Sequence, residues 1–168
     1  MRIRNEDMND LAAIRRVNYQ AFKDHPQHKP GAEPTEHRIV DELRASHSLA
    51  LSLVAEDEDG VMGHIAMSRA QVGQTGDWYL LGPVSVMPGR QNQGVGSALI
   101  REALSRMRGQ GADGVVLVGD PGFYGRFGFA SITGLTYAGV PHQFVLGLAF
   151  DHVQPQGAIR AHEAFYAG

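Results

Sequence analysis

The stretch that decides the fold is GRQNQGVGSALI, residues 89–100, in which Gly94 and Gly96 stand where a strand gives way to a helix. Glycine lets backbone N–H groups approach a ligand without an intervening side chain. The first N–H groups of a helix lack intrahelical partners, and the helix dipole favours negative charge beside them. From Trp78 to Ile100 the chain has no Asp or Glu that could occupy this position. The stretch therefore predicts an anion-binding helix start, of the kind that holds a phosphate.

Three kinds of phosphate-binding turn compete for this stretch. The P-loop needs a lysine after its last glycine, and none follows here. A dinucleotide-binding turn needs a third glycine, whose position is taken by Leu99, and it belongs to a run of β-α-β units that this chain lacks. Asp120 stands at a distance suited to a ribose-binding acid, which keeps a nicotinamide-cofactor enzyme as a remote alternative. The third option is the pyrophosphate of coenzyme A.

The residues on either side of the glycines predict the other helices and strands of the chain. Apolar spacings of three and four predict amphipathic helices, alternating or wholly apolar runs predict strands, and Gly82-Pro83 marks a bulge or an unpaired edge, since proline cannot donate a ladder hydrogen bond. Residues 23–35, rich in Pro and His, predict a mobile loop with His25 and His28 in it. The predicted elements are strand 2–4, helix 11–22, helix 36–47, a hairpin over 49–70 turning at Asp59-Gly60, strand 77–88, a helix from 95 that ends at Gly109, strand 115–118 and later strands that include 143–150.

This order predicts a mixed α+β fold rather than a doubly wound one. One strand–helix–strand crossover, over residues 78–118, lies inside an otherwise antiparallel arrangement. No repeat or linker divides the chain, so residues 1–168 are expected to form one domain. The expected architecture is a mostly antiparallel sheet flanked by helices, with a central β-α-β crossover and a splayed strand pair.

Composition narrows the function classes. The chain has 168 residues, 43% of them apolar, and a net charge of −3, which gives no reason to expect a nucleic acid partner. It has no cysteine, which excludes disulfides, thiolate metal sites and a cysteine nucleophile. No apolar run approaches membrane-spanning length and no signal peptide is visible, so a cytoplasmic location and no membrane partner are expected.

Two motifs resemble those of a known family. Gln91-x-x-Gly94-x-Gly96, preceded by LGPVSVMP, resembles the acetyl-CoA signature of the GNAT superfamily of N-acetyltransferases. The later DPGFYGRFGF resembles the family's second signature, and the order of elements matches the family from residue 1 to about 150. VPHQF and GAIRAHEAF resemble the closing segments of a small, stand-alone prokaryotic subgroup. The resemblance implies acetyl-CoA as cosubstrate, no metal, and a primary amine as acceptor.

The resemblance also implies where acetyl-CoA binds. The pyrophosphate would rest on the N–H groups of residues 91–97, and the pantetheine arm would pair with residues 84–86 like an added strand. That pairing needs a strand edge splayed from its neighbour, which Gly82-Pro83 could start. The cofactor-binding residues implied are Val84, Ser85, Val86, Gln91, Asn92, Gln93, Gly94, Val95, Gly96, Ser97, Phe123 and Arg126.

The same resemblance assigns the catalytic acid to Tyr124, aimed at the departing sulfur. A free Tyr has a pKa of about 10 and a thiol about 8.5, so full proton transfer is uphill by roughly 2 kcal/mol. Tyr124 is therefore expected either as the acid or as a hydrogen-bond donor to the thiolate. Because Phe123, Phe127 and Phe129 stand beside it, a packing role is the alternative.

No general base is evident. The strand segment 79–82, Tyr-Leu-Leu-Gly, lacks the Glu or His that many relatives carry there. His64, Asp120 and Glu56 are the substitutes. Each has an alternative: His64 as a structural histidine, Asp120 as a pantetheine or substrate contact, and Glu56 as part of a solvated hairpin tip.

Two functions from different classes stay open at this stage. The first is an N-acetyltransferase acting on a small-molecule or peptide amine, and the second is an acyl-CoA sensor or interaction module on the same fold. Tyr124 favours the enzyme, and the missing base favours the sensor. The acceptor amine and the acyl length carry no readable signal, and the oligomeric state stays open, with a homodimer among the options.

Overall fold

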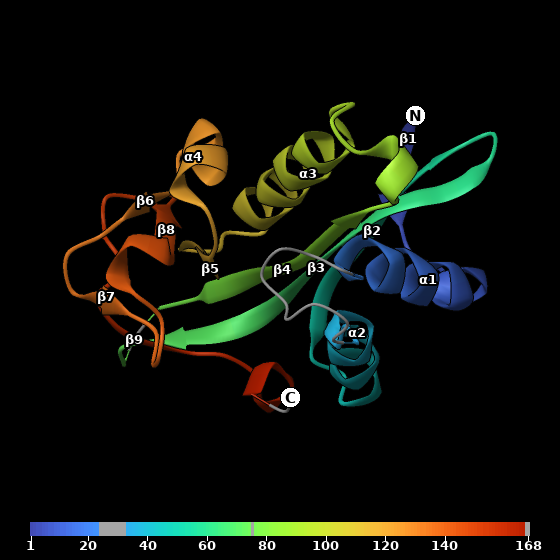
Figure 1. Cartoon of the computed structure of the whole chain (residues 1–168). Helices are drawn as coiled ribbons and strands as arrows, with labels where there is room; N and C mark the ends of the chain where they lie inside the picture. The colour runs from blue at the N-terminus through green and yellow to red at the C-terminus, as the bar shows by residue number, and fades with distance from the viewer. Residues whose placement is uncertain (24–32, 75, 167–168) are drawn as a thin grey trace.

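The computed structural model describes residues 1–23, 33–74 and 76–166, and a mixed β-sheet forms its centre (Figure 1). The strands follow the order β1-β2-β3-β4-β5-β8-β6, and every pair on this path is antiparallel except β4–β5. The short β9 pairs with β3 and, in parallel, with β7. The predicted α+β class with one parallel crossover is confirmed. The strands are β1 (Arg2–Asn5), β2 (Leu49–Asp57), β3 (Gly60–Val72), β4 (Trp78–Val86), β5 (Gly114–Val118), β6 (Ala130–Ser131), β7 (Leu135–Thr136), β8 (Val145–Ala149) and β9 (Gly157–Arg160).

Helices cover the two faces of the sheet. α1 (Leu11–Phe22) and α2 (Glu36–Ala45) lie on one face, and α3 (Val95–Gly109) lies on the other, with the single turn α4 (Pro121–Tyr124) beside it (Figure 1). α2 ends two residues before the predicted His47, because His47 has a left-handed φ of 57° that no helix can continue. Residues 24–32 of the predicted loop, with His25 and His28, lie outside the described residues.

The hairpin of β2 and β3 turns one residue earlier than predicted. Asp57 pairs with Gly60, so residues 58–59 form the two-residue turn. Gly60 itself opens β3 with a φ of 108°. The glycine still serves the turn, because a positive φ next to a tight hairpin carries no steric cost for a residue without a Cβ.

The core forms where the apolar stripe of α3 meets the sheet. Leu99, Ile100, Ala103 and Met107 are fully buried, and they pack on residues of β2, β3, β4 and β5. The spacings of three and four that predict this helix also put its apolar residues on one face. This packing fixes the position of α3 on the sheet, and with it the position of its first turn relative to β4.

β4 changes partners half-way along its length. Ile65 of β3 faces Val84 and Met67 faces Leu81, so Gly82-Pro83 opposes the single residue between them, as in a β-bulge. Pairing with β5 ends at Leu80, and beyond that residue β4 pairs only with β3. The predicted bulge and the predicted splay therefore coincide, and they leave one edge of residues 81–86 open.

Candidate active site

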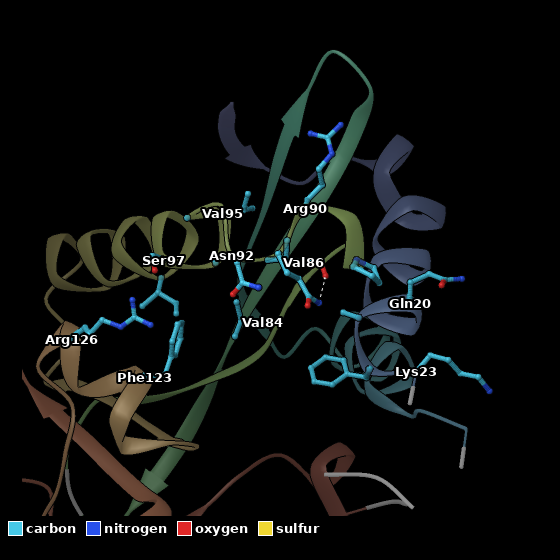
Figure 2. A pocket seen from close by; sticks show the side chains of 17 residues that line it. Gln20, Lys23, Val84, Val86, Arg90, Asn92, Val95, Ser97, Phe123 and Arg126 are labelled. Atoms are coloured by element: carbon cyan, nitrogen blue, oxygen red, sulfur yellow. Dashed lines mark hydrogen bonds between the residues drawn. The ribbon is translucent and has the colours of Figure 1, made fainter. Parts of the chain in front are cut away.

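A cleft of about 820 Å³ begins at this open edge. It extends from the start of α3 across β4 to the last turn of α1, with α4 forming the side opposite α1 (Figure 2). In Figure 2, Phe123 and Arg126 lie on one side of the strand that carries Val84 and Val86, and Gln20 and Lys23 lie on the other. The lining residues are Gln20, Ala21, Phe22, Lys23, Val84, Val86, Pro88, Arg90, Gln91, Asn92, Gly94, Val95, Gly96, Ser97, Ile100, Phe123 and Arg126.

The glycine turn has the geometry that its sequence predicts. Gly94 precedes α3 in the left-handed region at φ 86°, and the first turn of α3 has no acidic residue and no side-chain cap. A Cβ at Gly96 would meet only Val86, at 3.7 Å, so the space in front of the turn is open. Gln91 Nε2 donates to the carbonyl oxygen of Val86 at 3.1 Å, which ties the turn to the strand. The orphan N–H groups of α3 therefore face the cleft without an internal acceptor.

Two arginines border the cleft, and they differ in charge pairing. Arg90 donates to Asp57 and, at 2.7 Å, to Asp59, so its charge is balanced by the tip of the β2–β3 hairpin. The guanidinium of Arg126 lies 4.7 Å from the ring centre of Phe123, and within the described part of the chain no carboxylate pairs with it. Arg126 and the helix start therefore make the α3 end of the cleft electropositive.

α4 follows β5 directly and is capped by Asp120. The Oδ1 atom of Asp120 accepts a hydrogen bond from the N–H of Gly122 at 2.9 Å, which holds the start of this turn. Asp120 is exposed, and it lies outside the residues that line the cleft. The cap sets the direction of α4 and so places Phe123 in the wall of the cleft.

Tyr124 packs behind that wall. Its ring makes edge contacts with Phe123 and Phe129, at centroid distances of 4.9 and 6.1 Å. It also covers Gly119, where an added Cβ would come within 2.5 Å of the ring. Burial raises the pKa of Tyr124 to about 12, so the phenol stays protonated at neutral pH. Tyr124 borders the cleft through Phe123 and is not itself among the lining residues.

His64 lies on the opposite face of the sheet, beneath α1, with none of its surface exposed. Its Nε2 is 2.8 Å from Ser52 Oγ and its Nδ1 is 3.2 Å from Asn18 Nδ2. Burial lowers the pKa of His64 to about 4, so the ring is neutral. A general base must reach the proton that it removes, so this placement favours the structural alternative for His64.

The third candidate base is also engaged elsewhere. Glu56 pairs with Arg4, whose Nε lies 2.9 Å from Glu56 Oε1, and the pair lowers the pKa of that carboxyl. The pair joins β1 to β2, and it lies away from the cleft lining. Of the three acids and bases expected from the sequence, Asp120 is the one nearest α4 and the cleft wall.

The structure gathers most of the predicted cofactor-binding residues into the cleft. The exceptions are Ser85 and Gln93. The side chain of Ser85 points to the α1 face, because neighbours in a strand alternate between faces, and Gln93 Nε2 lies 3.5 Å from the carbonyl oxygen of Gly89. Sequence reasoning missed the wall supplied by residues 20–23, at the end of α1 and just after it, since nothing local in that segment indicates a ligand. Pro88, Arg90 and Ile100 were missed as well.

A family model of an acetyltransferase (GNAT) domain matches residues 2–132 of this chain. The chain belongs to the GNAT acetyltransferase family. Its relatives include the uncharacterised N-acetyltransferase YhbS of Escherichia coli strain K12, 38% identical over 96 residues, and YjhQ of the same strain, 33% identical over 133 residues. The match covers 56% of this chain and 58% of YhbS, and 76% of this chain and 68% of YjhQ. The chain thus matches little more than half the length of YhbS.

Solved GNAT structures share this fold over nearly the whole chain. A GNAT family acetyltransferase from Brucella melitensis, in complex with acetyl-CoA, is 44% identical with a TM-score of 0.83, covering 98% of this chain and 97% of that one. E. coli YhbS in complex with CoA is 27% identical with a TM-score of 0.87, covering 98% and 91%. The mostly antiparallel mixed sheet with its central crossover is therefore the GNAT fold.

The described residues show neither a metal-binding cluster nor a membrane-spanning helix. They contain no cluster of three or more His, Asp or Glu side chains arranged to hold a metal ion. None of their helices combines the length and the apolar character that crossing a membrane requires.

Proposed function

We propose that this protein transfers an acetyl group from acetyl-CoA to a primary amine by direct attack within a ternary complex. The observation that carries the proposal is the cleft, which joins the unpaired edge of β4 to the acid-free start of α3. An edge with free N–H and C=O groups suits the amides of a pantetheine arm, and the helix start suits a pyrophosphate. The Brucella and E. coli relatives were solved with acetyl-CoA and CoA, which supports the same cosubstrate here.

The chain has no cysteine, so the acetyl group cannot pass through a thioester on the enzyme. Direct transfer from acetyl-CoA to the amine avoids such an intermediate. The neutral amine nitrogen attacks the thioester carbonyl carbon, the C–N bond forms, and the C–S bond breaks with the electron pair leaving on sulfur. Coenzyme A departs as a thiolate that takes up a proton, and the nitrogen loses one. Attack in one complex requires both substrates in the cleft together, which its two walls, α1 and α4, permit.

For Tyr124 the structure favours one of the two predicted roles. With its pKa raised to about 12, full proton transfer to a thiolate of pKa about 8.5 would be uphill by about 5 kcal/mol. A hydrogen bond to the developing negative charge costs no such transfer. We therefore assign Tyr124 as a hydrogen-bond donor to the sulfur, held in place by its edge contacts with Phe123 and Phe129.

The proton from the amine needs an acceptor, and the described lining of the cleft includes no His, Asp or Glu. Asp120, exposed at the carboxyl end of β5, is the proposed acceptor, acting through water. The absence of a lining base also favours the second candidate, a sensor that binds acyl-CoA without turnover. We propose the enzyme first, as one domain over residues 1–168 that acts in the cytoplasm on a small-molecule or peptide amine.

A thiol-release assay over a panel of amines tests the proposal. Because the chain has no cysteine, a thiol-reactive dye reports released coenzyme A without a protein background. Thermal shift with acetyl-CoA, CoA and NAD identifies the ligand in parallel. Stabilisation by acetyl-CoA with amine-dependent thiol release is expected. Stabilisation by acetyl-CoA with no release over the panel would support the sensor, and stabilisation by NAD alone would overturn both candidates.

A further inference from the structure

A chain of hydrogen-bonded polar side chains crosses the protein on the α1 face of the sheet. At the outer end, Arg44 of α2 pairs with Glu6 at 2.7 Å. At the inner end, Ser85 of β4 donates to Asn18 Oδ1 at 3.1 Å. Between them, Ser52 contacts both Glu6 and His64, and His64 contacts Asn18. The four inner side chains, Asn18, Ser52, His64 and Ser85, are buried.

The direction of every hydrogen bond in this chain follows from its charged end. The ionised carboxylate of Glu6 can only accept, so the hydroxyl of Ser52 donates to it. Ser52 Oγ then accepts from His64, which puts the ring proton on Nε2 and leaves Nδ1 as an acceptor. Asn18 Nδ2 donates to that Nδ1 and, with its second hydrogen, to the carbonyl oxygen of Ile14 at 3.0 Å.

Asn18 and Ser85 use all of their side-chain hydrogen-bond donors. Both N–H bonds of the Asn18 amide are used, and its Oδ1 accepts from Ser85. Reversing the amide would set its oxygen against two other acceptors, His64 Nδ1 and the carbonyl oxygen of Ile14. Buried polar groups without partners cost about 1–3 kcal/mol each, so this arrangement holds Asn18 and Ser85 in one orientation.

The inner end of the chain meets the floor of the cleft, which is β4, and one of its walls, which is α1. Ser85 stands between Val84 and Val86, which line the cleft, in the half of β4 that has lost its β5 partner. Asn18 is fully buried and lies just before residues 20–23, the end of α1 and the residue after it, which form the α1 wall of the cleft. The bond between Ser85 and Asn18 therefore joins the open strand edge to the helix across from it.

We propose that Asn18 and His64 are positioning residues, which hold the open edge of β4 and the last turn of α1 at the spacing that acetyl-CoA requires. This role rests on the proposed function, because it assigns acetyl-CoA to the cleft. Neither side chain lines the cleft, so both act through Ser85 and through the placement of α1.

The test compares two serines of the same face of the sheet. Ser85→Ala removes the last hydroxyl of the chain, and Ser68→Ala removes a hydroxyl that is equally buried but has no hydrogen-bond partner. We expect Ser85→Ala to raise the Kd and KM for acetyl-CoA about fivefold, the effect of losing one buried hydrogen bond, with kcat nearly unchanged. Ser68→Ala should leave both constants within about twofold of the parent protein.

His64→Gln extends the test to a residue that is two hydrogen bonds away from the strand edge. It should also raise the KM for acetyl-CoA several-fold, and if this variant does not fold, the serine pair decides alone. Equal constants for Ser85→Ala and Ser68→Ala, or a lowered melting temperature of Ser85→Ala with unchanged KM, would overturn the positioning role while leaving the acetyltransferase intact. Failure of the parent protein to bind acetyl-CoA would instead overturn the proposed function, and this inference with it.

Discussion

The two halves of β4 are both mostly apolar, but they have different roles. Residues 78–80 pair with β3 on one side and β5 on the other, and all three side chains are buried. Residues 84–86 pair with β3 alone, and Val84 and Val86 line the cleft. The first half is part of the core, and the second is the floor of the candidate active site. One bulge at Gly82-Pro83 separates them. The site is therefore distinguished by the loss of pairing with β5 and not by a difference in hydrophobicity.

This difference predicts that substitutions in the two halves damage different properties. A residue in the doubly paired half contributes to stability, since its loss leaves a cavity. A residue in the open half contributes to ligand binding, since the neighbouring space is already empty. Truncation of one apolar side chain in each half tests this contrast directly.

Leu80→Ala should lower the free energy of unfolding by about 2–5 kcal/mol, the usual cost of truncating a buried leucine. Leu80 is 4% exposed and packs in the cluster with Trp78 and Val116. Val84→Ala, in the open half, should cost no more than about 1 kcal/mol and should weaken acetyl-CoA binding instead. Urea unfolding and calorimetric titration give the two quantities. Similar stability losses in both variants would contradict the division of β4.

Acid should destabilise the fold through His64. Its pKa is about 4 when folded against 6.5 when free, so below pH 6.5 the unfolded chain gains a proton that the folded chain refuses. The stability is complete above that value and falls by about 3 kcal/mol as the pH approaches 4. Denaturant unfolding from pH 7 to pH 4 measures the slope.

His64→Gln should flatten this slope, because glutamine does not titrate. Burial also lowers the pKa of His37, so His37 contributes to the loss of stability in acid in the same direction. His37→Gln is therefore measured beside His64→Gln, to separate the contributions of the two histidines to the slope. Burial raises the pKa of the Glu6 carboxyl, but its hydrogen bonds with Arg44 and Ser52 outweigh that effect and lower the pKa overall. Glu6 therefore adds to the loss of stability once the pH falls below its ordinary pKa of 4.5. An unchanged slope in His64→Gln would show that the buried ring contributes nothing between pH 4.5 and pH 6.5.

Tyr124→Phe should lower kcat about a hundredfold, which corresponds to about 2.7 kcal/mol, while the Kd for acetyl-CoA stays nearly constant. The change removes only the hydroxyl, and the ring contacts with Phe123 and Phe129 remain. Because the pKa of Tyr124 is about 12, the parent protein should show no loss of rate from tyrosine ionisation up to pH 10. Equal losses of kcat and of binding would make Tyr124 a packing residue.

Alanine substitutions at the two glycines of the turn should affect different properties, each by about 1 kcal/mol. Gly94→Ala should reduce stability, and Gly96→Ala should reduce acetyl-CoA binding. Gly94 has a φ of 86°, so Gly94→Ala should lose about 1 kcal/mol of stability through backbone strain. The added methyl group of Gly96→Ala would contact only Val86, at 3.7 Å, so the stability should be kept or increased. The affinity for acetyl-CoA should fall about tenfold, because the methyl group stands in front of the helix N–H groups. Thermal unfolding with and without acetyl-CoA distinguishes them, and a destabilised Gly96→Ala would contradict this account.

The glycine turn shows how far local sequence reaches. Gly94 and Gly96, the missing acids and the apolar stripe of α3 are all within one helix length of each other, so their geometry follows from neighbouring residues. The same holds for Gly82-Pro83, because proline removes a ladder donor wherever it stands. The geometry of the glycine turn and the splay could therefore be predicted, together with the order of the elements.

His64 shows where local sequence stops. As a sequence it is one histidine in a strand, equally suited to proton transfer and to packing. Its role depends on Asn18, 46 residues earlier, and on Ser52, 12 residues earlier. The wall from α1 was missed for the same reason, since only packing of that helix on β3 and β4 brings its last turn to the cleft.

By itself the sequence determined the mixed α+β fold, the acid-free glycine turn and the bulge in β4, because each arises from steric and electrostatic rules that act over a few residues. Only the tertiary structure decided which acids and bases reach the cleft and which residues form its second wall. It buried His64 in a chain of fixed hydrogen bonds, engaged Glu56 with Arg4, and left Asp120 exposed. Burial and partner choice depend on residues distant in sequence, and they set pKa and access, on which the chemistry depends.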